Sequence, residues 1–238
     1  IAARLKKDGH DVLVFDNFND YYDVDLKVAR QKALLADVEV AKGDITSEED
    51  LHSLFAAHKF DLVCHLAAQA GVRYSVECPE VYVNSNVRGT QLLLEMMKAH
   101  GVKRMVMAST SSVYGVNTEV PFTEDANADR PVSIYAATKR SAELIAHSYH
   151  SLYGIETTVL RFFTVYGPWS RPDMAMLKFA KLIKAGESID VYNQGDLRRD
   201  FTYIDDIVDG FSLAIDKPLG FEVINLGSRQ SNRFDVIH

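Results

Sequence analysis

The chain has 238 residues, a length that suits one large α/β domain or one domain plus part of a second. Its 47% hydrophobic and 25% charged residues are ordinary for a soluble globular protein. Its net charge of −7, without any basic block, argues against nucleic acid or an anionic membrane as the main partner. The two cysteines lack metal-ligand spacing, and no apolar run approaches the ~18 residues of a transmembrane helix. We therefore expect a cytoplasmic protein without a metal site.

Both ends of the sequence look like the interior of a longer chain. There is no initiator methionine, the segment 1–9 already has the pattern of a helix that stops at Gly9, and the segment 234–238 resembles the start of another helix. We therefore expect a fragment cut at both ends, and we find no signal peptide in it.

Up to residue 162, short apolar runs alternate with segments of helical periodicity. The apolar runs end at polar or small residues, which is typical of buried parallel strands. This alternation predicts an α/β fold, a Rossmann-type doubly wound parallel sheet with helices on both faces. The predicted strands are 11–15, 38–41, 62–68, 104–108 and 156–162, and the predicted helices are 24–35, 47–57, 81–99 and 133–152.

The pattern changes after Gly167. A helix over 174–184, a short strand near 189–192 and a helix over 205–215 indicate a smaller appended lobe. We therefore expect two domains. The first, residues 1–167, is the sheet domain without its first strand and glycine-rich loop, and the second, residues 168–238, is part of a smaller α/β lobe.

A tyrosine and a lysine lie four residues apart in the helix predicted to start at Ser133. Tyr135 and Lys139 therefore share one helix face, where the ammonium group can favour the phenolate and lower its pKa. This makes the pair a candidate general base. The same spacing also arises by chance, with a surface lysine beside a half-buried tyrosine, so the surrounding residues must decide.

Acidic, small and basic residues follow the predicted strands, at the edge where parallel sheets bind ligands. Asp16 has the position of a carboxylate that accepts hydrogen bonds from ribose hydroxyls and favours NAD over NADP, with a turn-capping aspartate as the alternative. Asp44 either contacts an adenine amino group or forms a turn. Ala67 and Ala68 either admit a cofactor or reflect tight packing, and Arg73 is either a pyrophosphate ligand or a solvated side chain.

Four hydroxyl side chains follow the predicted strand 104–108, in the stretch from Ser109 to Ser112. Adjacent strand-to-helix crossovers of a parallel sheet converge, so Thr110 is expected to lie near Tyr135. There its hydroxyl would polarise a substrate oxygen. The alternative is a solvated turn rich in serine and threonine.

As a set, these residues resemble the extended short-chain dehydrogenase/reductase group, the NAD-dependent epimerases and dehydratases of nucleotide sugars. The resemblance extends over essentially the whole chain. The motifs that carry it are Asp16-Asn17, Gly43-Asp44, His65-Leu66-Ala67-Ala68, Ser109 to Gly115, Tyr135-x-x-x-Lys139, Arg161 to Pro168 and Arg199 to Asp206.

The resemblance implies NAD as the cofactor, no metal, and a role for each of several residues. The expected catalytic residues are Tyr135, Lys139 and Thr110. The expected NAD-binding residues are Asp16, Asn17, Asp44, Ile45, Leu66, Ala67, Ala68, Arg73, Asn86, Ser109, Tyr135, Lys139 and Phe162. The expected substrate-binding residues are Ser111, Ser112, Thr164, Arg171 and Arg199.

The two residues after Thr110 indicate which reaction of the family to expect. Dehydratases resemble Thr-Asp-Glu at this place and decarboxylating relatives carry a glutamate, whereas this chain has Ser111 and Ser112, which cannot transfer protons in that way at neutral pH. The stretches 16–27 and 161–168 resemble UDP-glucuronate 4-epimerases. We therefore expect interconversion of UDP-glucuronate and UDP-galacturonate through a 4-keto intermediate.

Other reactions and other classes remain open. A UDP-glucose 4-epimerase would share every catalytic residue, a nucleotide-sugar 4,6-dehydratase would take its acid and base from elsewhere, and a non-catalytic NAD-binding sensor would not need Thr110, Tyr135 and Lys139 together. The resemblance further implies an enzyme of polysaccharide biosynthesis with a UDP-sugar substrate, and a homodimer formed through the helices 81–99 and 133–152.

Overall fold

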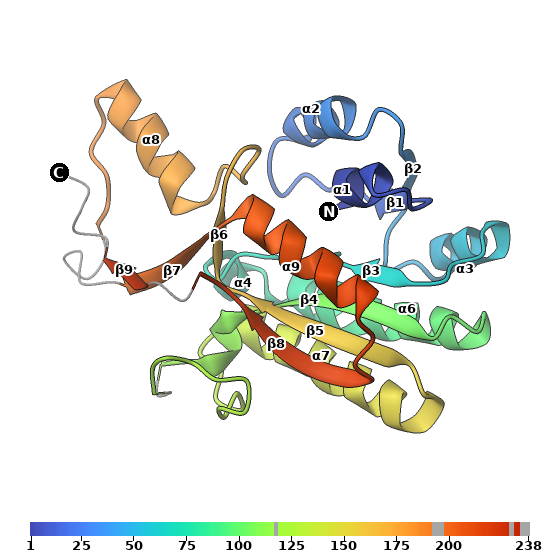
Figure 1. Ribbon diagram of the computed structural model, residues 1–238. Coiled ribbons are helices and arrows are strands. Elements are labelled where there is room, and N and C mark those ends of the chain that lie inside the picture. Colours follow the sequence, from blue (N-terminus) through green and yellow to red (C-terminus); the bar gives the residue numbers. More distant parts are fainter. Residues whose placement is uncertain (117–118, 192–197, 229–230, 234–238) are drawn as a thin grey trace.

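The computed structural model describes residues 1–116, 119–191, 198–228 and 231–233. Its centre is a sheet of four parallel strands in the order β3 (Val63–His65), β4 (Arg104–Thr110), β5 (Glu156–Phe162) and β8 (Phe221–Leu226) (Figure 1). A second parallel pair joins β1 (Leu13–Asp16) to β2 (Glu39–Lys42). Parallel strands connected through helices confirm the predicted Rossmann-like class.

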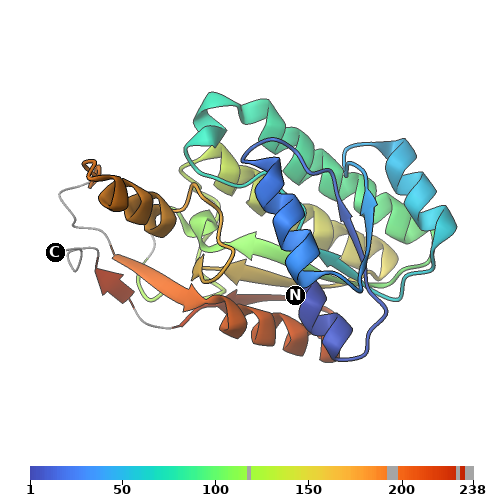
Figure 2. The ribbon, with the colours of Figure 1, turned by 90° about the horizontal axis from the view of Figure 1, so that it is seen from above.

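Helices cover both faces of the four-stranded sheet (Figure 1 and Figure 2). On one face lie α6 (Gly89–Ala99) and α7 (Ile134–Tyr153), and on the other lies α9 (Ile204–Asp216). Side chains alternate along β4, so Met107 joins the core under α6 and α7 while Val106 joins the core under α9. Three helices come before β3 in the chain: α1 (Ala2–Lys7), α2 (Val24–Leu34) and α3 (Glu48–Ala57).

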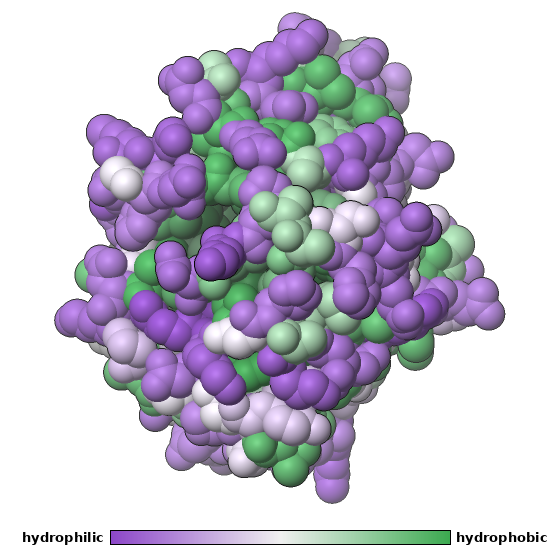
Figure 3. Space-filling view, turned by 90° about the vertical axis from the view of Figure 1, so that its right-hand side faces the viewer, coloured by the Kyte–Doolittle hydropathy of each residue, from purple (hydrophilic) through white to green (hydrophobic). Residues whose placement is uncertain are grey.

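Local sequence signals set both ends of α7. The Ser133 hydroxyl caps the helix by accepting a hydrogen bond from the Ala136 N–H at 3.1 Å, and Gly154 ends it in the left-handed conformation with φ of 67°. The predicted helix is therefore confirmed, and the cap places Tyr135 in the first turn. Within the described residues, none of the helices has both the length and the apolar character of a membrane span, and the face seen in Figure 3 shows hydrophilic and hydrophobic residues side by side.

The helix predicted over 81–99 is divided. The structure has α4 (Tyr74–Glu77), α5 (Pro79–Tyr82), a π-helical segment η1 (Val83–Arg88) and then α6. A π-helical turn contains more residues than an α-helical one, and such turns often occur at functional sites. Here the widened turn carries the buried side chain of Asn86.

A smaller sheet stands at one end of the molecule (Figure 1). Its strands β6 (Thr164–Tyr166) and β7 (Arg198–Tyr203) are parallel, and β9 (Ser231–Arg233) runs antiparallel to β7. The helix α8 (Ala175–Ala185) leads away from it, close to the predicted 174–184. Residues 187–191 form no strand, and residue 192 of the predicted strand 189–192 lies outside the described residues.

The segment after Gly167 also contributes to the main sheet. The helix α9 packs on its face, and β8 pairs with β5 from Thr157 opposite Phe221 to Phe162 opposite Leu226. The predicted boundary after residue 167 therefore marks the point where the chain passes into the smaller sheet. Residues 204–226, however, return to the four-stranded main sheet. Sequence analysis did not predict the strands β6, β7, β8 and β9.

Candidate active site

The candidate residues gather where strands of the main sheet end. Thr110 is the last residue of β4 and lies opposite Phe162, the last residue of β5. The first turn of α7, with Tyr135, comes to the same edge. This is the edge at which open parallel sheets bind ligands.

Thr110 and Tyr135 face each other. The Thr110 hydroxyl is placed to hydrogen-bond to the Tyr135 phenol, which favours the phenolate, and it lies 3.2 Å from the Ser112 hydroxyl. The Tyr82 ring stands edge-on to the Tyr135 ring, with 6.1 Å between the ring centroids. The structure therefore brings together the tyrosine and the threonine that the sequence predicted to meet.

Lys139 is buried one turn after Tyr135, with 4% of its surface exposed. Burial lowers the pKa of its ammonium group to about 8, and the negative charge of Glu143 opposes this effect. Burial, and secondly the positive charge of Lys139, lowers the pKa of His65 to about 3. Lys139 can therefore change its charge near neutral pH, which is typical of functional sites.

The pKa of Tyr135 differs from the expectation. The sequence predicted that Lys139 would lower it, but in the structure burial raises it above its ordinary value. The two contributions that oppose burial come from the Thr110 hydrogen bond and from the charge of Arg171. Tyr135 is half-buried at the start of α7, where its ring stands against that of Tyr82, and the spacing along the helix does not reveal this environment.

Arg171 is thus placed near Tyr135. Its guanidinium group forms a two-pronged ion pair with Asp173, at 3.0 and 2.8 Å, and the Tyr21 hydroxyl donates to the same carboxylate at 3.2 Å. In addition, Arg30 of α2 donates to the Ser170 carbonyl at 3.2 Å. The aromatic loop after β1 is therefore tied to the segment after β6, a link that sequence analysis did not predict.

A hollow of about 370 Å³ lies at the ends of β1 and β2. Asp44 lines it and is held in place, since it accepts hydrogen bonds from the Thr46 backbone N–H at 2.8 Å and from the Asn17 amide at 2.8 Å. Burial works against ionisation of Asp44, but the hydrogen bonds from Thr46 and Asn17 outweigh it, so its pKa is below the ordinary value. The residues that line the hollow are Asn17, Lys42, Gly43, Asp44 and Asp50.

Other predicted cofactor residues are exposed where strands end. Asp16 is exposed at the end of β1, and one of its carboxylate oxygens accepts the Phe18 N–H at 2.7 Å. Leu66, Ala67 and Ala68 follow β3 and are exposed. Exposed small residues at a strand end leave room for the close approach of a flat, polar ligand such as a dinucleotide.

Three predicted cofactor residues are instead engaged within the protein. Asn86 accepts the Gln69 N–H at 2.8 Å and donates to the Thr138 hydroxyl at 3.0 Å. Ser109 donates to Glu143, so a cofactor contact would have to come from its backbone. The Ile45 side chain packs so closely on α6 that a Cβ at Gly89 would lie 2.8 Å from it.

The remaining predicted residues fall into two groups. Ser111 and Ser112 form the start of a 3-10 turn, η2 (Ser111–Tyr114), directly after Thr110, and Thr164 begins β6 two residues after the end of β5. All three hydroxyl residues therefore lie just after strands of the main sheet that end at the edge where Tyr135 lies. In contrast, Arg73 is exposed at the start of α4, and Arg199 is exposed on β7 in the smaller sheet.

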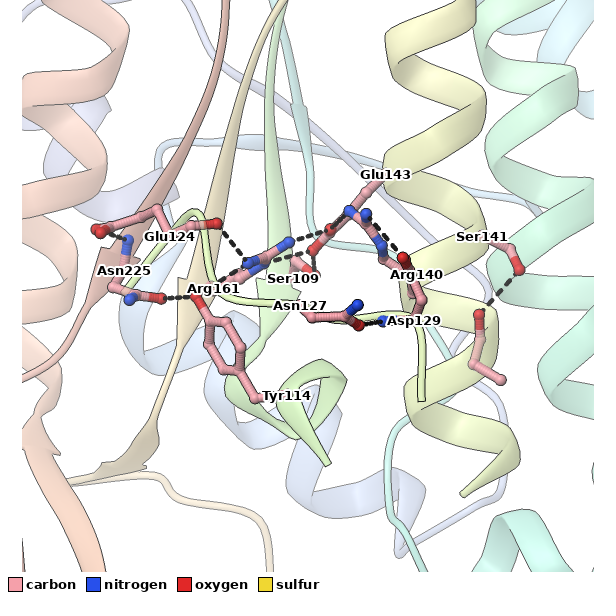
Figure 4. A network of polar contacts seen from close by, with 11 residues as sticks. Ser109, Tyr114, Glu124, Asn127, Asp129, Arg140, Ser141, Glu143, Arg161 and Asn225 are labelled. Atoms are coloured by element: carbon pink, nitrogen blue, oxygen red, sulfur yellow. Dashed lines mark hydrogen bonds and ion pairs between the residues drawn. The ribbon is translucent and has the colours of Figure 1, made fainter. Parts of the chain in front are cut away.

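A buried polar network next to the site was not predicted (Figure 4). Glu143 of α7 and Arg161 of β5 form its centre, with 1% and 2% of their side chains exposed. Arg161 extends it by donating to the Tyr114 hydroxyl at 2.9 Å. A charged side chain inside the apolar strand 156–162 was the available signal, because a buried arginine requires a partner.

Comparisons with known proteins agree with this geometry. The model of the NAD dependent epimerase/dehydratase family matches residues 1–227. The chain belongs to this family. It is 52% identical over 222 residues to UDP-glucuronate 4-epimerase 4 of Arabidopsis thaliana, which covers 91% of this chain and 51% of that protein. It is 48% identical over 219 residues to protein CapI of Staphylococcus aureus, which covers 92% of this chain and 66% of that protein.

The fold also matches solved structures of family members. The UDP-glucuronic acid 4-epimerase from Bacillus cereus, crystallised with UDP-glucuronic acid and NAD, superposes with a TM-score of 0.88 at 35% sequence identity. The match covers 97% of this chain and 73% of that one. The chain thus spans about half to two thirds of the length of the two relatives named above.

Proposed function

We propose that this chain carries the active site of an NAD-dependent UDP-glucuronate 4-epimerase. The observation on which the proposal rests is the contact between Tyr135 and Thr110 beside the buried Lys139, at a sheet edge where Ser111 and Ser112 stand in place of an acid and a base. The proposal is supported by the Arabidopsis and Bacillus cereus relatives, which are epimerases of this substrate by name.

NAD, when bound, would accept hydride from the sugar and return it. The hollow beside Asn17 and Asp44 is suited to its adenosine part, with the exposed Asp16 toward the ribose hydroxyls. Ala67 and Ala68 allow close approach, and Lys139 is on the correct helix face to hold a second ribose. The other proposed cofactor contacts are Ile45, Leu66, Arg73, Asn86, Ser109 and Phe162.

The protein's own groups would move one proton. Tyr135 accepts the proton of the C4 hydroxyl when that carbon is oxidised, and it gives the proton back when the other face is reduced. The Thr110 hydroxyl, which faces the Tyr135 phenol, orients the sugar oxygen. The charge of Arg171 favours the phenolate. Lys139, on the same face of α7 as Tyr135, adds a second cation.

Hydroxyls and cations near Tyr135 would select the sugar. Ser111, Ser112 and Thr164 offer uncharged hydrogen bonds to a C6 carboxylate without supplying the proton that would promote loss of CO₂. Arg171 lines the sugar pocket, and Arg199 on β7 pairs with the UDP phosphates.

The wider setting is also part of the proposal. We place the NAD-binding domain at residues 1–167 and the nucleotide-sugar lobe at residues 168–238, with β8 and α9 returning to the first. A homodimer through α6 and α7 is supported by Leu144 and Leu152 on α7, which are 51% and 70% exposed. By supplying UDP-galacturonate, the enzyme would serve polysaccharide biosynthesis in the cytoplasm.

The test is the conversion itself. The protein in its naturally encoded length is incubated with NAD and UDP-glucuronate, and proton NMR follows the anomeric signal of UDP-galacturonate. Tyr135→Phe should lower turnover by at least ~10²-fold, because it removes the proton acceptor. Tyr153→Phe, at the other end of α7, should leave turnover unchanged.

The rival functions give other products. Conversion of UDP-glucose but not of UDP-glucuronate would contradict the proposal in favour of a neutral-sugar epimerase, and a 4-keto-6-deoxy sugar would indicate a dehydratase. NAD binding without conversion of any UDP-sugar would indicate a sensor.

A further inference from the structure

Glu143 joins three elements of the fold at one buried point. From α7, its Oε1 accepts the Ser109 hydroxyl of β4 at 2.5 Å, while the Arg161 guanidinium of β5 donates to Oε1 at 3.1 Å and to Oε2 at 2.7 Å. Arg140, one turn earlier on the same helix, donates to Oε2 at 2.9 Å. Both carboxylate oxygens therefore have two partners each, and the side chain is held in one position (Figure 4).

The network continues beyond Arg161 to the loop that follows the site. Arg161 donates to the Tyr114 hydroxyl at 2.9 Å and to the Glu124 carbonyl at 3.3 Å. The Tyr114 hydroxyl in turn donates to the Asn225 side chain of β8 at 2.7 Å. The turn after Thr110 is therefore held against β5 and β8 through these bonds.

Stability alone does not explain why these charges are buried. The cost of removing an ion pair from water offsets most of its attraction, and apolar side chains of similar volume would often be as stable. What the pair does supply is fixed geometry, because a buried carboxylate with four donors cannot shift without losing some of them. The elements that this carboxylate joins therefore indicate which part of the fold it holds in place.

The bond between Glu143 and Ser109 spans the two elements that form the catalytic contact. Ser109 immediately precedes Thr110 on β4, and Glu143 lies two turns after Tyr135 on α7. A change in the spacing of β4 and α7 would therefore separate Thr110 from Tyr135. A displacement of about 1 Å in such a contact is enough to cost ~10²-fold in rate.

We propose that Glu143 is a positioning residue, which acts through Ser109 to hold the Thr110 hydroxyl against the Tyr135 phenol. This role rests on the proposed function, but it concerns the contact between the two side chains and can be measured without substrate. Glu143 also faces Lys139 one turn away and supports its positive charge.

The test is Ser109→Ala, which removes one hydroxyl but leaves Glu143 paired with Arg161 and Arg140, so the protein is expected to fold. Its matched control is Thr157→Val, which removes a fully buried hydroxyl from the far end of β5. NMR of protein with ¹³C-labelled tyrosine follows the ionisation of Tyr135, assigned by its absence in Tyr135→Phe.

Ser109→Ala should move the ionisation of Tyr135 to higher pH, because the Thr110 hydrogen bond that favours the phenolate is weakened. Thr157→Val should leave the ionisation of Tyr135 unchanged. In the epimerase assay we expect kcat of Ser109→Ala to fall about 10-fold with KM nearly unchanged, and the rising limb of the pH profile to move in the same direction. The groups that face Tyr135 and Lys139 and enter this titration are Thr110, Arg171, Tyr82, Glu143 and His65.

A second variant tests the carboxylate itself. Glu143→Gln should also shift the ionisation of Tyr135 to higher pH, because a neutral amide holds Ser109, Arg161 and Arg140 less firmly than the carboxylate does, whereas Glu95→Gln on α6 should have no effect. If Ser109→Ala changed stability alone, with Tyr135 ionisation and kcat as in the control, Glu143 would be merely structural and the proposal overturned. Absence of epimerase activity in the unmodified protein would instead count against the proposed function, and the NMR titration would still decide the role of Glu143.

Discussion

Among single residues, burial has the largest effect on charge near the site. His65 at the end of β3 is 3% exposed, and its ring nitrogen Nε2 lies 2.9 Å from the Thr90 hydroxyl. Burial, and secondly the positive charge of Lys139, lower its pKa from 6.5 to about 3. The folded protein therefore keeps this imidazole neutral at pH values where the unfolded chain would protonate it.

This shift predicts a loss of stability in mild acid. Between pH 6.5 and 3 the unfolded state binds a proton that the folded state does not, so the free energy of unfolding falls as the pH falls through this window. The contribution of His65 amounts to about 2 kcal/mol at pH 5 relative to pH 7. Urea unfolding at the two pH values should show this difference in the unmodified protein and a smaller one in His65→Gln. His10→Gln, at an exposed position, is the control, and equal pH dependence in both variants would contradict the assignment.

At the scale of elements, the sequence predicted the strands and helices of the first sheet well because each is a local pattern. Apolar runs marked the first five strands, and Ser133 with Gly154 marked α7. The strand β8 was missed because its partner β5 lies about 60 residues earlier and because Glu222 interrupts its apolar run. The π-helical segment η1 was missed because residues 83–88 continue the helical pattern of their neighbours, and the contacts of Asn86 are with Gln69 and Thr138, 17 and 52 residues away.

The η1 segment yields a prediction about stability. The Asn86 amide nitrogen donates to the Gln69 carbonyl and to the Thr138 hydroxyl, each at 3.0 Å, and so joins the loop after β3 to α7. Asn86→Asp has nearly the same shape but cannot donate, so it places a carboxylate against a carbonyl oxygen. We expect the free energy of unfolding to fall by about 3 kcal/mol in chemical denaturation. Asn84→Asp, exposed in the same segment, should cost far less, and an equal loss in both would contradict this role.

At the scale of the whole molecule, the loop and helix that follow β1 are joined to the segment that follows β6, near Tyr135. Tyr21 contacts Asp173, which pairs with Arg171, and Arg30 contacts the Ser170 carbonyl. Neither contact follows from sequence spacing, since the partners are 152 and 140 residues apart. These bonds hold the segment that presents Arg171 to Tyr135.

This link predicts an effect on substrate affinity. Tyr21→Phe removes the hydroxyl that steadies Asp173, so Arg171 becomes free to adopt other positions and the proposed sugar pocket is less well ordered. We expect KM for UDP-glucuronate to rise about 3- to 10-fold with a smaller change in kcat, measured by steady-state kinetics. Tyr74→Phe keeps the aromatic packing around Tyr21 and is the control. A fall in kcat at unchanged KM would show that Tyr21 acts on the chemical step instead.

The sequence by itself determined the class of fold and the family resemblance, and it predicted that Tyr135, Lys139 and Thr110 act together. These conclusions depend on short-range patterns: apolar runs, helical periodicity, capping residues, and the spacing of four residues between the tyrosine and the lysine. Only the tertiary structure decided which charges act on them. The place of Arg171 beside Tyr135, the neutral state of His65 and the pairing of Glu143 with Ser109 and Arg161 all depend on burial and on contacts between distant segments. Such contacts exist only once the chain has folded, because desolvation and long-range hydrogen bonds have no local signature.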